Sequence, residues 1–144
     1  MRFWDSSAVV PLLLDESATA AAESLYRDDP RLLVWWATPV ECASAVARRE
    51  RDGVLPRAAA DAARRRLRAL AERWDEVLPA DAIRSAAQRL LRLHPLHAAD
   101  SVQLAAARAA CRGNPEGFPF VCADQRLAAA AALEGFDVLG VVVK

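Results

Sequence analysis

The chain has 144 residues, 54% of them hydrophobic, and its 19 basic side chains balance its 19 acidic ones. This length suits one domain, and we expect a compact globule over residues 1–144 with a substantial apolar core. The zero net charge excludes a globally basic surface for nucleic acid, so any electrostatic attraction must be local. No apolar run reaches the roughly 18 residues that a membrane span needs, and Asp5 interrupts any signal-peptide pattern.

Cysteine usage indicates the redox compartment. Cys42, Cys111 and Cys122 are odd in number, lack C-x-x-C spacing and lie among apolar residues. This pattern predicts reduced core thiols. Together with the lack of a span or leader pattern, it predicts a cytoplasmic protein without membrane contact.

Short apolar runs alternate with helical patterns along the chain. The apolar runs predict strands at about residues 2–5, 32–37, 74–78, 118–123 and 137–143. The segments between them predict helices at about 6–14, 17–28, 39–52, 56–73, 80–93, 97–112 and 125–134. Because strands and helices alternate, we expect right-handed crossovers and an α/β fold with a mostly parallel sheet covered on both faces. Trp35 and Trp36 are expected in its core.

Acidic residues follow the predicted strands at the edge where an open parallel sheet binds its ligands. Asp5 ends the first strand, Glu41 lies in the first turn of the helix after the second, and Asp124 ends the fourth. Asp100 lies at the start of the helix that leads into that fourth strand. Each of the first three also has an ordinary structural explanation, because acids cap helices and favour the positive end of the helix dipole.

Asp100 is the acid that capping explains least well. A rotation of about 100° per residue places the solvated face of its helix at Ser101, Arg108 and Arg112. Asp100 instead shares a stripe with Leu104, so its carboxylate is expected to project from surface that ought to be buried.

Four carboxylates in one cleft would repel one another unless a cation neutralised them. Oxygen ligands without a His or Cys cluster favour Mg²⁺ or Mn²⁺ over zinc. His94 and His97 have helical spacing but no partners that complete a zinc set, so we interpret both as structural or solvated. Ions held by carboxylates support the hydrolysis of phosphodiester bonds, which is the reaction we expect.

Residues 48–73 form a local basic segment, with nine arginines against four acids. Arginine binds phosphate well because its planar fork is always charged. A bias towards arginine from a GC-rich genome would explain the composition equally well. The candidates for contact with a nucleic-acid backbone are Arg48, Arg49, Arg64 and Arg65.

Four stretches together resemble PIN-domain ribonucleases, specifically the VapC-type toxins of bacterial toxin–antitoxin pairs. They are "FWDSSAVVPLLLDE", "TPVECASAVARR", "LHAADSVQLAAA" and "FVCADQRLAAAAALEGFDVL", and they span nearly the whole chain. The resemblance implies a three-layer α/β/α sandwich in which Asp5 and Asp100 are the primary metal ligands. It also implies that Glu41 and Asp124 complete the catalytic site and that Ser6 supports it through a hydrogen bond.

The same resemblance implies a Mg²⁺- or Mn²⁺-dependent endoribonuclease that cuts RNA and is neutralised by a small antitoxin protein. It further implies a homodimer, an antitoxin segment lying along the active-site groove, and an RNA groove bordered by residues 48–73. One departure is Cys122, which stands where the family commonly has Thr or Ser. Its weak hydrogen-bonding capacity bears on the position of Asp124.

Two other functions remain open at this point. One is a catalytically silent PIN-like module that binds RNA or a protein partner and keeps the acids for folding or recognition. The other is a phosphoacceptor receiver domain, whose chemistry needs an internal lysine near the acids. The single lysine of this chain is Lys144, which disfavours the receiver domain.

Overall fold

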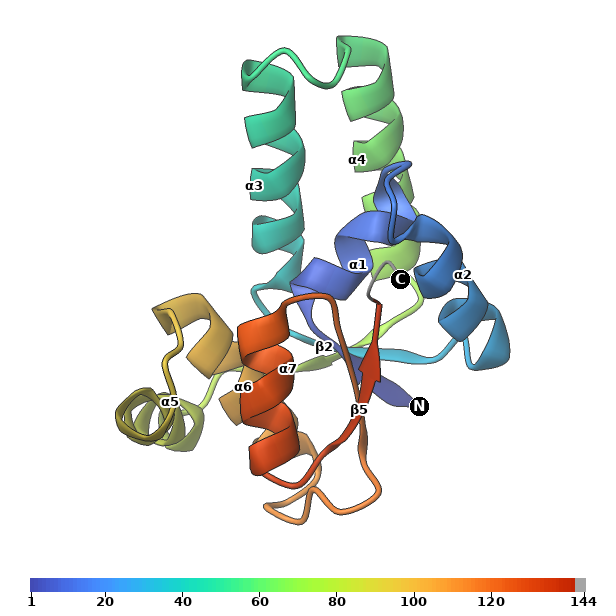
Figure 1. The fold of residues 1–144 in the computed structure, drawn as a ribbon. Coiled ribbons are helices and arrows are strands. Elements are labelled where there is room, and N and C mark those ends of the chain that lie inside the picture. Colours follow the sequence, from blue (N-terminus) through green and yellow to red (C-terminus); the bar gives the residue numbers. More distant parts are fainter. Residues whose placement is uncertain (142–144) are drawn as a thin grey trace.

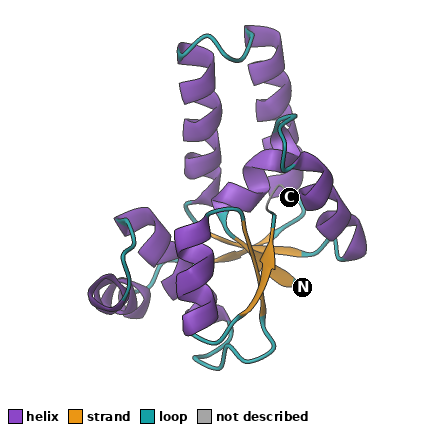
Figure 2. Ribbon diagram, in the orientation of Figure 1, coloured by secondary structure: helices purple, strands orange, loops and turns teal. Residues whose placement is uncertain are grey.

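The computed structural model describes residues 1–141, and the end of the predicted fifth strand, residues 142–143, lies outside them. Within residues 1–141, five strands form one parallel sheet in the order β3-β2-β1-β4-β5. They are β1 (Arg2–Trp4), β2 (Leu32–Trp35), β3 (Asp75–Val77), β4 (Pro119–Cys122) and β5 (Asp137–Gly140). The strands are the middle layer of the molecule (Figure 2).

Seven helices in residues 1–141 connect these strands (Figure 1). They are α1 (Ser6–Leu13), α2 (Thr19–Asp28), α3 (Thr38–Arg51), α4 (Arg57–Ala71), α5 (Asp81–Leu93), α6 (Ala98–Ala110) and α7 (Gln125–Leu133). The predicted elements all exist, and their ends differ from the prediction by at most two residues except at the last strand. None of these helices combines the length and apolarity needed to cross a bilayer.

Successive side chains of each strand point to opposite faces of the sheet, which gives the fold two cores. Trp4 and Val121 pack with α1 to α4 on one face, whereas Phe3 and Phe120 pack with α5, α6 and α7 on the other. The rings of Phe3 and Phe120 stack with centroids 5.4 Å apart. The predicted three-layer α/β/α sandwich is therefore confirmed.

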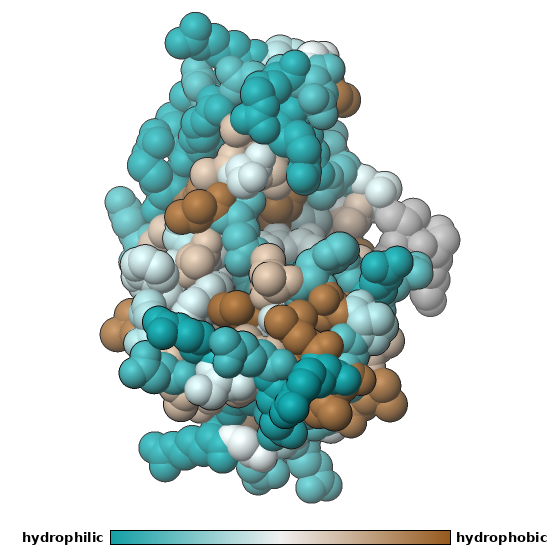
Figure 3. All heavy atoms as spheres, turned by 90° about the vertical axis from the view of Figure 1, so that its left-hand side faces the viewer, coloured by the Kyte–Doolittle hydropathy of each residue, from teal (hydrophilic) through white to brown (hydrophobic). Residues whose placement is uncertain are grey.

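Helices α3 and α4 form a hairpin that rises from the carboxyl edge of the sheet (Figure 1). Its turn passes through Gly53, whose φ of +73° favours glycine. The far end of the hairpin carries mainly hydrophilic side chains (Figure 3).

The positions of Trp36 and Ser101 correct the sequence predictions. Trp36 lies beyond the end of β2 and is 53% exposed, so of the two predicted core tryptophans only Trp35 is buried. Ser101 is fully buried rather than solvated, and its hydroxyl donates to the carbonyl of Ala98 at 2.8 Å. Helix α6 is thus enclosed on more sides than an amphipathic surface helix, because it lies between the sheet, α5 and α7.

A partly buried network of polar contacts centred on Glu134 joins the helices on the second face. The Glu134 carboxylate contacts His94 Nε2 at 2.7 Å and accepts from Arg108 at 2.8 Å. This contact supports the structural interpretation of His94, and it shows that Arg108 is half-buried rather than part of a solvated face.

Candidate active site at the carboxyl edge of the sheet

One cleft of about 730 Å³ lies at the carboxyl edge of the sheet, and all four predicted acids line it. They come from different elements: Asp5 follows β1, Asp124 follows β4, Glu41 lies in α3 and Asp100 lies in α6. The remaining lining residues are Ser6, Ser7, Val10, Glu16, Val40, Ser44, Ala45, Arg48, Arg49, His97 and Ala99. The parallel topology therefore gathers residues that are far apart in the chain.

Asp5 is both a helix cap and a cleft residue. Its backbone N–H continues the sheet ladder by donating to Val121 O at 3.0 Å. Its side chain, 2% exposed, accepts a hydrogen bond from Ser7 N at 3.0 Å and another from Ser7 Oγ. Asp5 therefore caps α1 and lines the cleft at the same time.

Ser7 was not singled out from the sequence, yet it connects two strand ends. Its hydroxyl donates to Asp5 and accepts from Ala123 N at 3.0 Å, so it joins the end of β1 to the end of β4. The available signal was its position two residues after Asp5, where a helix cap finds its N–H donor.

Glu41 projects from the first turn of α3 and has two hydrogen-bonding neighbours. Ser6 Oγ donates to its Oε2 at 2.7 Å, and Gln103 Nε2 lies 3.3 Å from Oε1 and 3.4 Å from Oε2. Gln103 is another residue that the sequence analysis missed, because a glutamine within an apolar helix carries no motif.

Asp124 caps α7 by accepting from Leu127 N at 2.8 Å. Its own N–H donates to Cys122 Sγ at 3.3 Å, and Cys122 Sγ also lies 3.8 Å from Ser7 Oγ. The thiol thus occupies a hydrogen-bonding position next to two cleft residues. Burial raises the pKa of Cys122 to about 12, so this thiol stays protonated.

Asp100 is half-buried in the first turn of α6, where it lines the cleft rather than lying fully inside the core. Leu104, on the same stripe, is fully buried as the sequence pattern implied. His97 directly precedes this helix, is exposed and lines the same cleft. Solvation of His97 agrees with the sequence analysis, but its place in the cleft was not foreseen.

The carboxyl groups of the cleft are electrostatically coupled. Burial raises the pKa of Asp5 to about 7, the charges of Glu41 and Asp100 act in the same direction, and the hydrogen bonds from Ser7 oppose it. The pKa of Glu41 is raised by burial and by the charge of Asp100. The pKa of Asp100 is raised by burial and by the charge of Asp124. Each acid therefore makes the ionisation of its neighbours harder.

The donor chemistry of the cleft fits a hard divalent cation, because several carboxylates share one partly buried space with raised pKa values. Across residues 1–141, however, no group of three His, Cys, Asp or Glu side chains is arranged so that it could hold an ion as it stands. Binding of an ion would therefore have to draw the carboxylates together.

The four candidate arginines differ in their surroundings. Arg48 and Arg49 line the cleft, but the guanidinium of Arg49 is paired with Glu16 at 3.0 Å. Arg64 lies outside the cleft lining and is paired with Glu50 at 2.7 Å and with Asp61 at 3.1 Å. Arg65 is exposed and does not line the cleft. Within the described part of the chain, Arg48 is the cleft arginine without an ion-pair partner.

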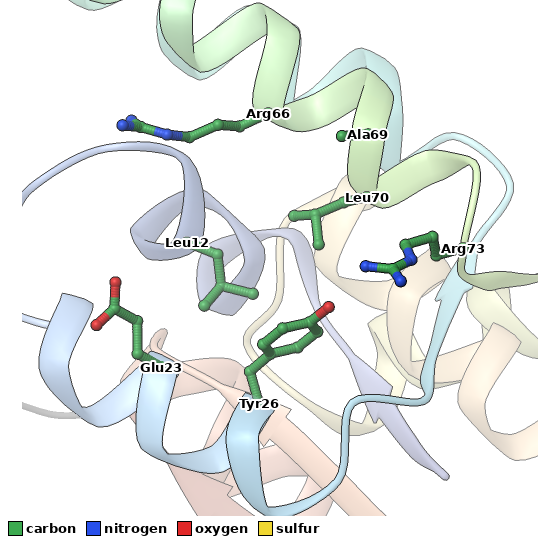
Figure 4. A pocket seen from close by; sticks show the side chains of 7 residues that line it. All are labelled: Leu12, Glu23, Tyr26, Arg66, Ala69, Leu70 and Arg73. Atoms are coloured by element: carbon green, nitrogen blue, oxygen red, sulfur yellow. The ribbon is translucent and has the colours of Figure 1, made fainter.

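A second cavity of about 300 Å³ lies between α1, α2 and α4, and it shares no lining residue with the acidic cleft (Figure 4). Leu12, Tyr26 and Leu70 supply much of its apolar surface, and Arg66 and Arg73 lie along the α4 side.

Comparisons with known proteins identify the fold. No protein-family model and no curated protein matches the sequence. Among solved structures, the chain is similar to a toxin–antitoxin complex from Klebsiella pneumoniae, with a TM-score of 0.63 and 13% sequence identity. The similarity covers 100% of this chain and 97% of the other. At this identity it shows that the two chains share a fold.

The raised pKa of Asp5 predicts how the stability of the metal-free protein depends on pH. The unfolded chain releases this proton near pH 3.8, whereas the folded state holds it up to about 7, so the free energy of unfolding should fall as pH rises through this window. Glu41 and Asp100 act with the same sign. Relative to the wild type, Asp5→Asn should gain stability between about pH 5 and pH 8, by an amount of the order of a few kcal/mol.

Urea unfolding in EDTA at about pH 5 and about pH 8 measures the free energy of unfolding of the wild type and of Asp5→Asn. Asp137→Asn, a change of an exposed aspartate at the opposite edge of the sheet, is the control and should leave the profile unchanged. A wild-type stability that rises through this window, or an unaltered profile in Asp5→Asn, would contradict the assignment.

Proposed function

We propose that the protein is a metal-dependent endoribonuclease of the PIN type and the VapC-like toxin of a toxin–antitoxin pair. The observation that carries the proposal is the gathering of four carboxylates from four elements into one cleft. The fold similarity to a protein in a toxin–antitoxin complex supports it independently of the site. The resemblance of the four acidic stretches to VapC-type toxins also supports the proposal.

In this proposal Asp5 and Asp100 would hold Mg²⁺ or Mn²⁺ directly, with Glu41 and Asp124 completing the acidic wall. When bound, the divalent ion would supply neutralising charge for the phosphate and Lewis-acid activation for hydrolysis. The raised pKa values of Asp5, Glu41 and Asp100 support a cation at this place, because a cation would relieve their mutual repulsion.

The chain's own residues would position the reactants. A carboxylate of the cleft accepts a hydrogen bond from the attacking water and orients its oxygen in line with the phosphorus. Ser7 holds Asp5, and Ser6 holds Glu41, so these acids keep their orientation while the substrate binds. Arg48, an exposed residue of the cleft lining, would contact the phosphate backbone.

The partner in this proposal is a small antitoxin protein. Support comes from a series of adjoining cavities along the inner side of α4. Leu12 and Arg66 line both the cavity of Figure 4 and a second, neighbouring cavity. Leu13 lines both this second cavity and a third one. That third cavity meets the acidic cleft at the Glu16–Arg49 ion pair. A peptide with apolar side chains and a basic end would match this path.

A homodimer is also part of the proposal. Large apolar side chains gather on the lower half of one face of the molecule (Figure 3). Several large apolar residues in residues 1–141 are well exposed, among them Leu78 at 66% and Leu93 at 55%. Exposed apolar surface of this kind is typical of protein interfaces.

A catalytically silent module that binds RNA or a protein partner is the alternative. It would use the same cleft and the same arginine but would leave RNA intact with or without metal. Cleavage assays therefore separate the two functions.

The acidic cleft predicts that Asp5→Asn and Asp100→Asn each abolish RNA cleavage while the protein stays folded. Both substitutions remove a negative charge without changing the size of the side chain. The measurement is cleavage of total RNA in Mg²⁺, with EDTA as the metal-free arm and circular dichroism as the folding check. Asp137→Asn is the matched control and should cut as the wild type does. Wild-type cleavage that persists in EDTA, or either cleft variant cutting at the wild-type rate, would refute the proposed chemistry.

The position of Arg48 predicts a distinct effect on RNA binding. Arg48→Ala should weaken binding several-fold and reduce its dependence on salt, because one phosphate contact is lost. Arg89→Ala removes the same charge from the exposed side of α5 and should leave binding unchanged. Fluorescence anisotropy with a labelled RNA at several salt concentrations, on the Asp100→Asn background to prevent cleavage, checks this. Equal effects of the two substitutions would show that Arg48 acts only through net charge.

A further inference from the structure

Gln103 is a fully buried amide in the middle of α6, three residues after Asp100. It is enclosed by the helix layer of the second core, where its neighbours in sequence are Leu104 and a run of buried alanines. A side chain with two donors and an acceptor is unusual in such a place.

The amide nitrogen of Gln103 is directed at α3. Nε2 donates to Thr38 Oγ1 at 3.2 Å, and Thr38 is itself fully buried. The same nitrogen lies 3.3 Å and 3.4 Å from the two carboxylate oxygens of Glu41. One N–H can therefore bond Thr38 while the other is shared between the oxygens of Glu41.

The oxygen of the same amide shows that packing does not explain this residue. Gln103 Oε1 is buried and has no hydrogen-bond partner within the described residues. An unpaired buried acceptor destabilises the fold, and an apolar side chain of equal length would fill the space without that cost. Reversing the amide would set its oxygen against the Glu41 carboxylate, so the carboxylate determines which way the amide lies.

We propose that Gln103 is a positioning residue that, held by Thr38, fixes the Glu41 carboxylate against the wall of the acidic cleft. Ser6 Oγ holds Oε2 of the same carboxylate at 2.7 Å from the side of α1. Glu41 is thereby fixed from two helices, α1 and α6. The contact stands on the geometry alone, whereas its effect on catalysis rests on the proposed nuclease function.

This role gives α6 two tasks at one site. The helix presents Asp100 to the cleft, and three residues later, on a neighbouring position of its surface, it presents Gln103 to Glu41. Helix α6 therefore carries one acid of the cleft and contacts another.

A double-mutant cycle tests the coupling. Gln103→Met keeps the length of the side chain but removes the donor, and Glu41→Gln removes the charge that the donor meets. Gln103→Met should lower kcat for RNA cleavage by about 10- to 100-fold with little change in KM. In the Glu41→Gln background it should have no further effect, because the two changes break one interaction. Gln88→Met, at an exposed position of α5, is the control and should leave both constants unchanged.

A purely structural role would make Gln103→Met equally harmful in both backgrounds, and that result would overturn the proposal. The Gln103–Glu41 contact can also be tested without any nuclease activity, because the side-chain amide of Gln103 can be observed by NMR in the wild-type protein. Its ¹⁵N and ¹H signals should exchange slowly with solvent and should shift on Glu41→Gln but not on Gln88→Met. Unshifted signals would overturn the contact, even if Gln103→Met fails to fold or the wild type cuts no RNA.

Discussion

The structure depends on one electrostatic constraint: four carboxylates share a partly buried cleft at the carboxyl edge of a parallel sheet. The topology gathers three of these acids, because β1, β2 and β4 run in the same direction and the segments after them meet at one edge, and the first turn of α6 adds Asp100. Burial raises the pKa of Asp5 to about 7, and the neighbouring charges act in the same direction. Raised carboxyl pKa values that cluster in one cleft are typical of binding and catalytic sites.

Hydrogen bonds hold the acids in place against this repulsion. Ser7 binds Asp5 and joins it to the end of β4, Ser6 and Gln103 bind Glu41, and Leu127 N binds Asp124. The orientation of Asp5, Glu41 and Asp124 is thus fixed by hydrogen bonds to neighbouring groups. A bound cation would have to draw these carboxylates together, because no three of the His, Cys, Asp and Glu side chains in residues 1–141 are arranged to hold an ion as they stand.

Much of the fold could be predicted from the sequence, because apolar runs and helical spacing depend on local periodicity. The convergence of Asp5, Glu41 and Asp124 could be predicted because the carboxyl ends of parallel strands share an edge. Asp100, which lies in α6 rather than after a strand, could be predicted from its position on an apolar stripe. Contacts between side chains on different elements could not be predicted from the sequence. The periodicity of α6 alone predicts a solvated Ser101, whereas α5, α7 and the sheet enclose this helix. Arg49 and Gln103 find their partners on other elements, and no spacing along the chain contains that information.

The central claim is that Asp5 and Asp100 act together on one divalent cation. The most direct measurement is anomalous diffraction from crystals grown with Mn²⁺, in which the position of the ion is seen independently of activity. The account predicts a strong anomalous peak within coordination distance of both carboxylates, and no peak there in crystals of Asp5→Asn. Anomalous density elsewhere on the protein, with the cleft free of manganese in the wild type, would contradict it.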